Sequence, residues 1–113
     1  MPRLRESTTA VIGRGERWHG RFATEPYECG WAVEAVVFLR LLEAEGEPRA
    51  PVAVQISPDG MHWVDEGTRI PLPARVGAIE FARIGRFGNW LRLAGELERG
   101  TACEVIATLH LKG

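Results

Sequence analysis

The sequence predicts an all-β fold: a two-sheet β-sandwich or jelly roll of eight to nine strands. Three observations predict it. Apolar and polar residues alternate along most of the chain, which is the period of half-buried strands. Turn signals rich in Gly, Pro, Asn and Asp recur about every ten residues, as in sandwiches. No helical segments alternate with these strands, which argues against a doubly wound α/β fold.

The N-terminal part of the chain predicts two strands, over residues 8–13 and 20–24. Residues 31–45 fit two interpretations. Their Ala, Glu, Leu and Arg content favours a helix, whereas their alternation and the run Val36-Val37-Phe38 favour a strand. We expect a long strand, with the helix as the alternative. Because both of its faces carry apolar residues, beginning with Trp31, we expect it to be central and covered on both sides.

The clearest strand covers residues 51–57, where Val52, Val54 and Ile56 share one face. Ser57-Pro58-Asp59-Gly60 follows as a turn, since Pro presets φ and Asp-Gly tolerates left-handed geometry. A short strand then carries Trp63 and ends near Gly67. Three further strands are expected over residues 78–84, 89–96 and 103–112, separated by glycine-containing loops.

Length and charge exclude several classes of protein. A chain of 113 residues fits one domain and can bury a core without metals or disulfides. We expect a short arm over residues 1–6 and one sandwich domain over 7–113. A net charge of −1 disfavours nucleic acid as a partner. No apolar run is long enough for a membrane span or a signal peptide, so we expect a protein made in the cytoplasm with no membrane partner.

The sequence lacks the residue groupings that catalysis requires. Ser57 lies at a turn, and the histidines are far apart and outside any metal-ligand spacing: His19, His62 and His110. We therefore expect no enzyme, no metal and no cofactor. The two cysteines, Cys29 and Cys103, are 74 positions apart, and without an export signal we expect free buried thiols rather than a disulfide.

Two stretches resemble motifs of discoidin-like (F5/8 type C) β-sandwich domains. The first runs from Val52 to Trp63 and contains a strand, Ser-x-Asp-Gly, and a Trp three residues on. The second is Asn89-Trp90-Leu91-Arg92-Leu93, similar to an aromatic–aliphatic–Arg–aliphatic strand. The resemblance covers roughly the second half of the chain and implies a jelly roll. Its structural motif would be Ser57, Asp59, Gly60, Trp63, Trp90 and Arg92. From the residues we expect both tryptophans in the core and Arg92 beside Asp59.

The first half departs from that pattern, because it does not match the loops with which discoidin domains bind sugars or lipids. The compact form is more similar to small β-sandwich proteins found among phage and virus-like structural components. This resemblance implies a place in a virion, as a decoration or tail component, or in another protein assembly.

Trp18 differs from the other tryptophans because its neighbours are polar and charged. An aromatic side chain in such a setting can anchor an interface or serve as a sugar platform. The candidate contact residues are Trp18, His19, Arg21 and Tyr27. The alternative for Trp18 is simple packing at the edge of the sandwich.

We expect a structural or assembly protein that binds copies of itself, a larger protein shell, or both. The lack of a catalytic set, the compact length and the resemblance support this expectation. The alternative is a discoidin-like module that binds carbohydrate or another ligand.

Overall fold

The computed structural model describes residues 7–113, which form nine strands and the loops between them. The strands are β1 (Ser7–His19), β2 (Arg21–Ala23), β3 (Tyr27–Glu28), β4 (Glu34–Glu45), β5 (Val52–Ser57), β6 (Val64–Ile70), β7 (Ile79–Gly85), β8 (Trp90–Glu96) and β9 (Ala102–Lys112). This confirms the predicted all-β sandwich. The predicted arm, residues 1–6, lies outside the described residues. None of the residues that are described forms a helix long and apolar enough to span a membrane.

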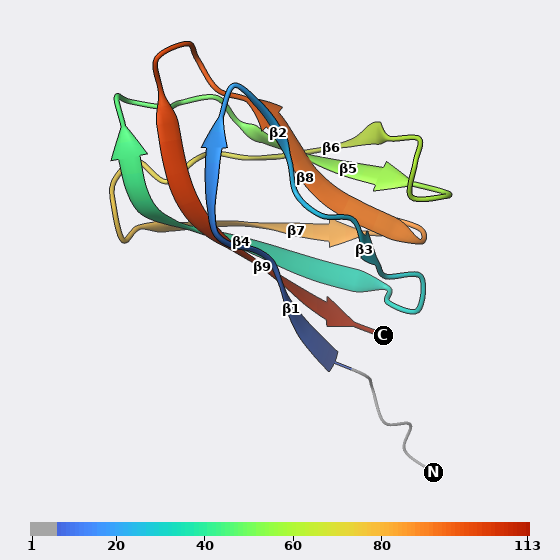
Figure 1. Cartoon of the computed structure of the whole chain (residues 1–113). Helices are drawn as coiled ribbons and strands as arrows, with labels where there is room; N and C mark the ends of the chain where they lie inside the picture. Colours follow the sequence, from blue (N-terminus) through green and yellow to red (C-terminus); the bar gives the residue numbers. More distant parts are fainter. Residues whose placement is uncertain (1–6) are drawn as a thin grey trace.

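The strands form two antiparallel sheets that pack face to face (Figure 1). Sheet A has the order β1-β9-β4-β7. Sheet B has the order β2-β8-β5-β6, and β3 also pairs with β8. The first strand thus lies beside the last, with Ser7 opposite Lys112.

The core lies between the sheets and follows the predicted alternation. On β4 the inward set is Ala35, Val37, Leu39 and Leu41, and on β9 it is Cys103, Val105, Ala107, Leu109 and Leu111. Sheet B contributes Val52 and Val54 from β5 and Leu91 and Leu93 from β8. Burying one such leucine or valine contributes about 1.5–3 kcal/mol, so this layer is the main source of stability.

Residues 34–45 form a strand, which confirms the strand interpretation over the helix. β4 pairs with β9 on one side and β7 on the other, so it is central. The expectation that both its faces are covered is wrong. Val36 and Phe38 are only half-buried on the outer face, and Trp31, expected in the core, is 40% exposed.

β1 is longer than predicted because two irregularities let it continue. Its register against β9 shifts between Val11 and Gly13 and again between Arg14 and Glu16. Gly15 has a φ of 59°, which side chains rarely adopt and which suits a bulge. Gly20, with a φ of 54°, then turns the chain from sheet A into β2 of sheet B.

The turn after β5 forms as predicted. The Ser57 hydroxyl oxygen accepts the backbone N–H groups of Asp59 and Gly60 at 3.2 and 2.8 Å. Gly60 has a φ of 79°, and a Cβ there would lie 3.2 Å from the indole ring of Trp90. The next strand, β6, does not end near Gly67 but continues to Ile70.

Cys29 and Cys103 are both free and buried, as expected. Burial raises the pKa of the Cys29 thiol to about 11 and also raises the pKa of the Cys103 thiol.

Candidate interaction surface

The four residues expected to contact a partner do not form one site. Trp18 is only 1% exposed, and its ring stacks on Phe22 with centroids 4.1 Å apart. Trp18 therefore packs inside the sandwich, and its indole ring offers no platform at the surface. Arg21 pairs in register with Glu96 at one end of β8, whereas Tyr27 pairs with Leu91 toward the other end. His19 is exposed at the end of β1.

Arg92 contacts different groups from the one expected. Its Nε–H donates to the side-chain oxygen of Gln55 at 2.8 Å, and its guanidinium lies 4.3 Å from the ring centroid of Trp63. Asp59 is instead bound within its own turn, where the imidazole Nδ1 of His62 lies 2.6 Å from its carboxylate. The expected pairing of Arg92 with Asp59 is therefore wrong. Trp63 and Trp90 are half-buried rather than fully in the core.

The outer face of sheet A carries a mainly apolar region. Strand registers place Val11, Thr108, Phe38 and Phe81 in one row across β1, β9, β4 and β7. Val36 lies on one side of this row, and Ile106 and Ile79 lie on the other side. We call these seven residues the open face of sheet A. No further strand or helix among residues 7–113 lies on it.

Aromatic contacts hold the centre of the open face together. The rings of Phe38 and Phe81 have centroids 5.9 Å apart. His110 meets Phe38 edge-on at 5.0 Å, and the guanidinium of Arg83 lies 5.1 Å from the Phe81 ring. These contacts arrange the rings, but they do not bury them. Phe81 remains 48% exposed, Ile79 57% and Val11 41%.

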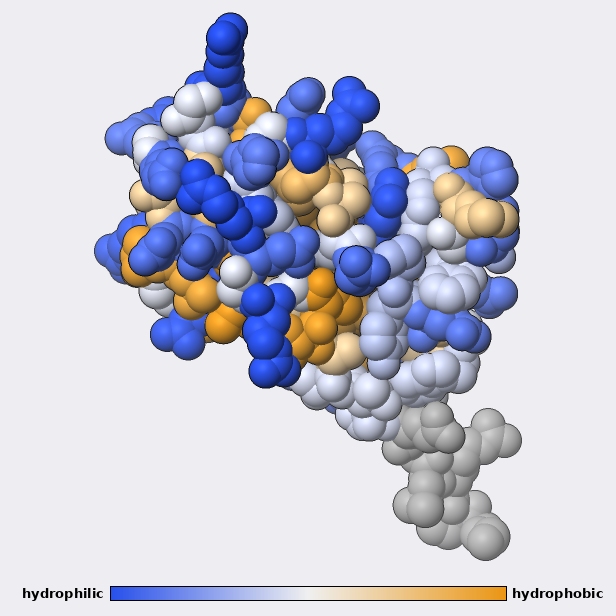
Figure 2. Space-filling view, viewed as in Figure 1, coloured by the Kyte–Doolittle hydropathy of each residue, from blue (hydrophilic) through white to orange (hydrophobic). Residues whose placement is uncertain are grey.

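β7 has an inverted pattern for a strand with one solvated face. Ile79 and Phe81 point outward, while Glu80 and Ala82 share the inward side with Ile84. An antiparallel sheet with one face in water usually turns its polar residues outward. A contiguous exposed apolar region of this kind is typical of protein interaction sites. Apolar patches bordered by charged side chains are visible in the space-filling view (Figure 2).

Charged residues of both signs lie around and within the open face. Arg14 ends the row that holds Ile106 and Ile79, and Arg40 lies in that row between the two isoleucines. Beyond that row, Glu43 pairs in register with Glu104, and Arg17 forms a bidentate pair with Glu45 at 3.0 and 3.2 Å. An apolar centre with a charged rim is the usual anatomy of a protein–protein interface.

Ser57, Asp59 and His62 lie together, but their order does not suit nucleophilic catalysis. The Ser57 hydroxyl donates to Asp59 at 3.0 Å, and His62 bonds to Asp59 rather than to Ser57. A serine nucleophile needs the base on its own hydroxyl. Within the described part of the chain, no three His, Cys, Asp or Glu residues gather as a metal site.

The sequence contained one signal for the open face. Residues 31–45 carry apolar side chains on both faces, a pattern that predicts a strand covered on both sides. Alternation within residues 78–84 shows that Ile79 and Phe81 share a face, but it does not show which face points outward. That depends on how β7 pairs with β4.

No protein-family model matches the chain, and no curated protein matches it in sequence. The fold is similar to that of the SPBc2 prophage-derived protein YomS, with a TM-score of 0.64 and 8% identity over 100% of this chain and 98% of that one. A chain in the structure of infectious bursal disease virus Gx strain gives a TM-score of 0.47 and 7% identity, over 96% of this chain and 32% of that one. At 8% identity the likeness to YomS shows the fold alone: this chain is an all-β sandwich similar in fold to a prophage-derived protein.

Proposed function

We propose that this protein is a non-enzymatic assembly component that binds other copies of itself through the open face of sheet A. The observation that carries the proposal is the outward placement of Phe81 and Ile79, 48% and 57% exposed, beside the half-buried Phe38. Covering these side chains would remove apolar area from water, at about 25 cal/mol for each Å².

A second copy is the partner that the charges favour. The net charge is −1, so two copies repel each other little at long range. The rim of the open face carries both signs, which disfavours a strongly charged polymer as the partner. A two-fold axis along the row of Val11, Thr108, Phe38 and Phe81 would place the same apolar row of each copy against the other, as isologous interfaces require.

We further propose that the assembly is a virion, in which the protein is a decoration or tail component, or another protein shell. The motif resemblance to small sandwiches of phage and virus-like structural proteins supports it, and the whole-chain likeness to a prophage-derived protein is consistent with it. The alternative function is a discoidin-like module that binds carbohydrate or another ligand. Trp18, its expected sugar platform, is buried, which disfavours a carbohydrate site built on that ring.

Sedimentation velocity over a concentration series tests the proposal. We expect the wild-type protein to change from monomer to a symmetric oligomer as the concentration rises, and Ile79→Glu to stay monomeric. Val64→Glu is the matched control, since Val64 also opens a strand and is 60% exposed, but lies on β6 of sheet B. A wild-type protein that is monomeric throughout, or equal effects of the two variants, would contradict self-association through this face. Electron microscopy of the purified protein would then show the symmetry of the assembly.

A further inference from the structure

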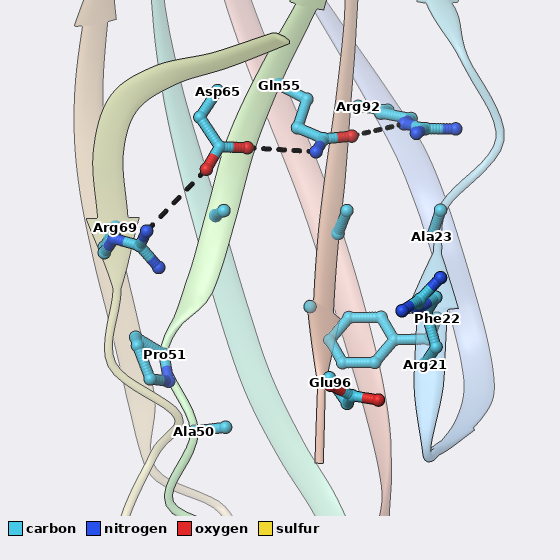
Figure 3. A pocket seen from close by; sticks show the side chains of 13 residues that line it. Arg21, Phe22, Ala23, Ala50, Pro51, Gln55, Asp65, Arg69, Arg92 and Glu96 are labelled. Atoms are coloured by element: carbon cyan, nitrogen blue, oxygen red, sulfur yellow. Dashed lines mark hydrogen bonds and ion pairs between the residues drawn. The ribbon is translucent and has the colours of Figure 1, made fainter. Parts of the chain in front are cut away.

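Sheet B carries a hollow on its outer face, on the opposite side of the molecule from the open face of sheet A. Figure 3 shows the side chains that line it. Its volume is about 700 Å³. Three alanines form its floor: Ala23 on β2 pairs with Ala94 on β8, and Ala94 pairs with Ala53 on β5. Because adjacent strands all carry a single methyl group at this level, the sheet surface is recessed between longer side chains. The volume is in the range of small-molecule sites.

A chain of polar side chains forms one wall of this hollow. Asp65 accepts from the Gln55 amide nitrogen at 3.0 Å, and the Gln55 amide oxygen accepts from Arg92 Nε at 2.8 Å (Figure 3). The two bonds fix which way the Gln55 amide faces. The bond from Nε also holds one edge of the Arg92 guanidinium in place. The central carbon of the guanidinium lies 4.3 Å from the ring centroid of Trp63.

The other edge of the Arg92 guanidinium is unused. Within residues 7–113 its two terminal nitrogens, Nη1 and Nη2, have no hydrogen-bond acceptor. The side chain is half-buried, and this partial loss of hydration lowers the pKa of Arg92, because water stabilises the charged form less. An ordered, partly dehydrated guanidinium with free donors matches a carboxylate, which it binds through two parallel hydrogen bonds.

The charged residues around the hollow favour a ligand that carries a single negative charge. Three arginines line it, Arg21, Arg69 and Arg92, and two acids, Asp65 and Glu96, so the excess is one positive charge. Arg69 lies 3.7 Å from Asp65, which offsets both of those charges. A doubly charged phosphate would meet the two carboxylates at close range, whereas a monocarboxylate matches the excess.

We propose that the hollow on sheet B binds a small organic monocarboxylate with a flat apolar body. Its carboxylate accepts two hydrogen bonds from the terminal nitrogens of Arg92, and its body lies on the methyl groups of Ala23, Ala53 and Ala94. This site is separate from the open face of sheet A, so it does not depend on self-association.

The test is a titration with 2-naphthoate, followed in amide and arginine Nε–Hε spectra of the ¹⁵N-labelled full-length protein. For a ligand of this size we expect saturable shifts at Ala53, Ala94 and the Arg92 Nε–H, with a Kd of about 1 mM. The neutral analogue 2-naphthalenemethanol and the dianion 2-naphthyl phosphate should bind about tenfold more weakly or not at all.

Three variants test the geometry. Arg92→Lys keeps the charge but loses the paired donors, and should weaken 2-naphthoate binding about tenfold. Ala53→Leu fills the floor without changing any charge and should abolish binding. Arg83→Lys is the matched control, since Arg83 also lies over an aromatic ring, 5.1 Å from the centroid of Phe81, but on sheet A. It should bind as the wild-type protein does.

The spectra themselves report whether each variant is folded, so loss of binding and loss of structure are distinguishable. The proposal is overturned if the wild-type protein shows no saturable shift by about 10 mM 2-naphthoate. It is equally overturned if the neutral analogue binds as tightly, or if Arg92→Lys leaves 2-naphthoate binding unchanged.

Discussion

The ring of Trp18 stacks on the ring of Phe22, with centroids 4.1 Å apart and planes 11° from parallel. Trp18 belongs to β1 in sheet A, whereas Phe22 belongs to β2 in sheet B. The stack therefore joins the two sheets where the chain crosses between them at Gly20. Phe22 has the room to lie there because Gly95, its register partner on β8, has no side chain.

Removing the Phe22 ring should destabilise the protein. We expect Phe22→Ala to lower the free energy of unfolding by about 2–4 kcal/mol, because it leaves a cavity beside the buried Trp18. Phe81→Ala is the matched control: it removes the same ring from a side chain that is 48% exposed and should cost about 1 kcal/mol or less. Urea denaturation at low protein concentration measures both. Equal losses in the two variants would show that the stack does not join the sheets.

Gly95→Ala tests the same contact from the other side. A Cβ at Gly95 would lie 2.9 Å from Cζ of Phe22 and 3.1 Å from its Cε1, and the ring cannot shift freely because Trp18 packs against it. We expect a loss of about 1–3 kcal/mol in the free energy of unfolding. Gly85→Ala on β7 meets no atom within 4 Å and serves as the control. Thermal unfolding of both variants gives the comparison, and an unchanged melting temperature in Gly95→Ala would contradict the packing.

The sequence predicts the fold in those segments where a single local rule, such as strand alternation or turn chemistry, determines the conformation of each residue. Alternation alone determines the inward residues of β9, and Pro, Asp and Gly chemistry alone determines the turn after β5. Trp18 shows where such local rules fail. Its neighbours in the chain are charged because they point away from the core, so a polar sequence context does not imply an exposed ring. Burial of Trp18 depends on Phe22, which belongs to the other sheet.

The surfaces of the two sheets could be predicted only in part, because they depend on strand pairing. The floor of the hollow on sheet B consists of single alanines on three strands, and nothing in their separate sequences indicates that they lie side by side. The motif marks Arg92 as a residue of interest, but its contacts with Gln55 and Trp63 arise from the register of β5 and β8 and from the position of the turn.

Asp59 should make the free energy of unfolding depend on pH in the acidic range. The backbone N–H groups of His62 and Met61 bond to its carboxylate, and with the His62 side chain they hold the pKa of Asp59 well below its usual range. Its unfolded-state pKa is about 3.9, so the unfolded chain binds the proton first. The stabilisation by the charged carboxylate is therefore present above about pH 4 and is lost as the pH falls further.

Urea denaturation between about pH 5 and pH 2 tests this dependence. Asp59→Asn keeps an oxygen acceptor in the turn but has no carboxylate to titrate. We expect its stability to fall less steeply with decreasing pH than that of the wild-type protein. Identical slopes in the two proteins below pH 4 would mean that the turn does not stabilise the ionised carboxylate.

The two cysteines should be inert in the native protein. Cys29 and Cys103 are 0% and 2% exposed, and the thiol of Cys29 also lies 3.9 Å from the carbonyl oxygen of Gly88. Burial raises the pKa of Cys29 to about 11, so at pH 8 only about one thiol in a thousand is the reactive thiolate. Thiol titration with Ellman's reagent should therefore be slow in the native state, and unfolding in urea should release both thiols rapidly. Because the reagent reaches these thiols only when the sandwich opens, the native rate should rise more in Phe22→Ala than in Phe81→Ala. Rapid labelling of the folded wild-type protein at pH 8 would contradict the burial of both side chains.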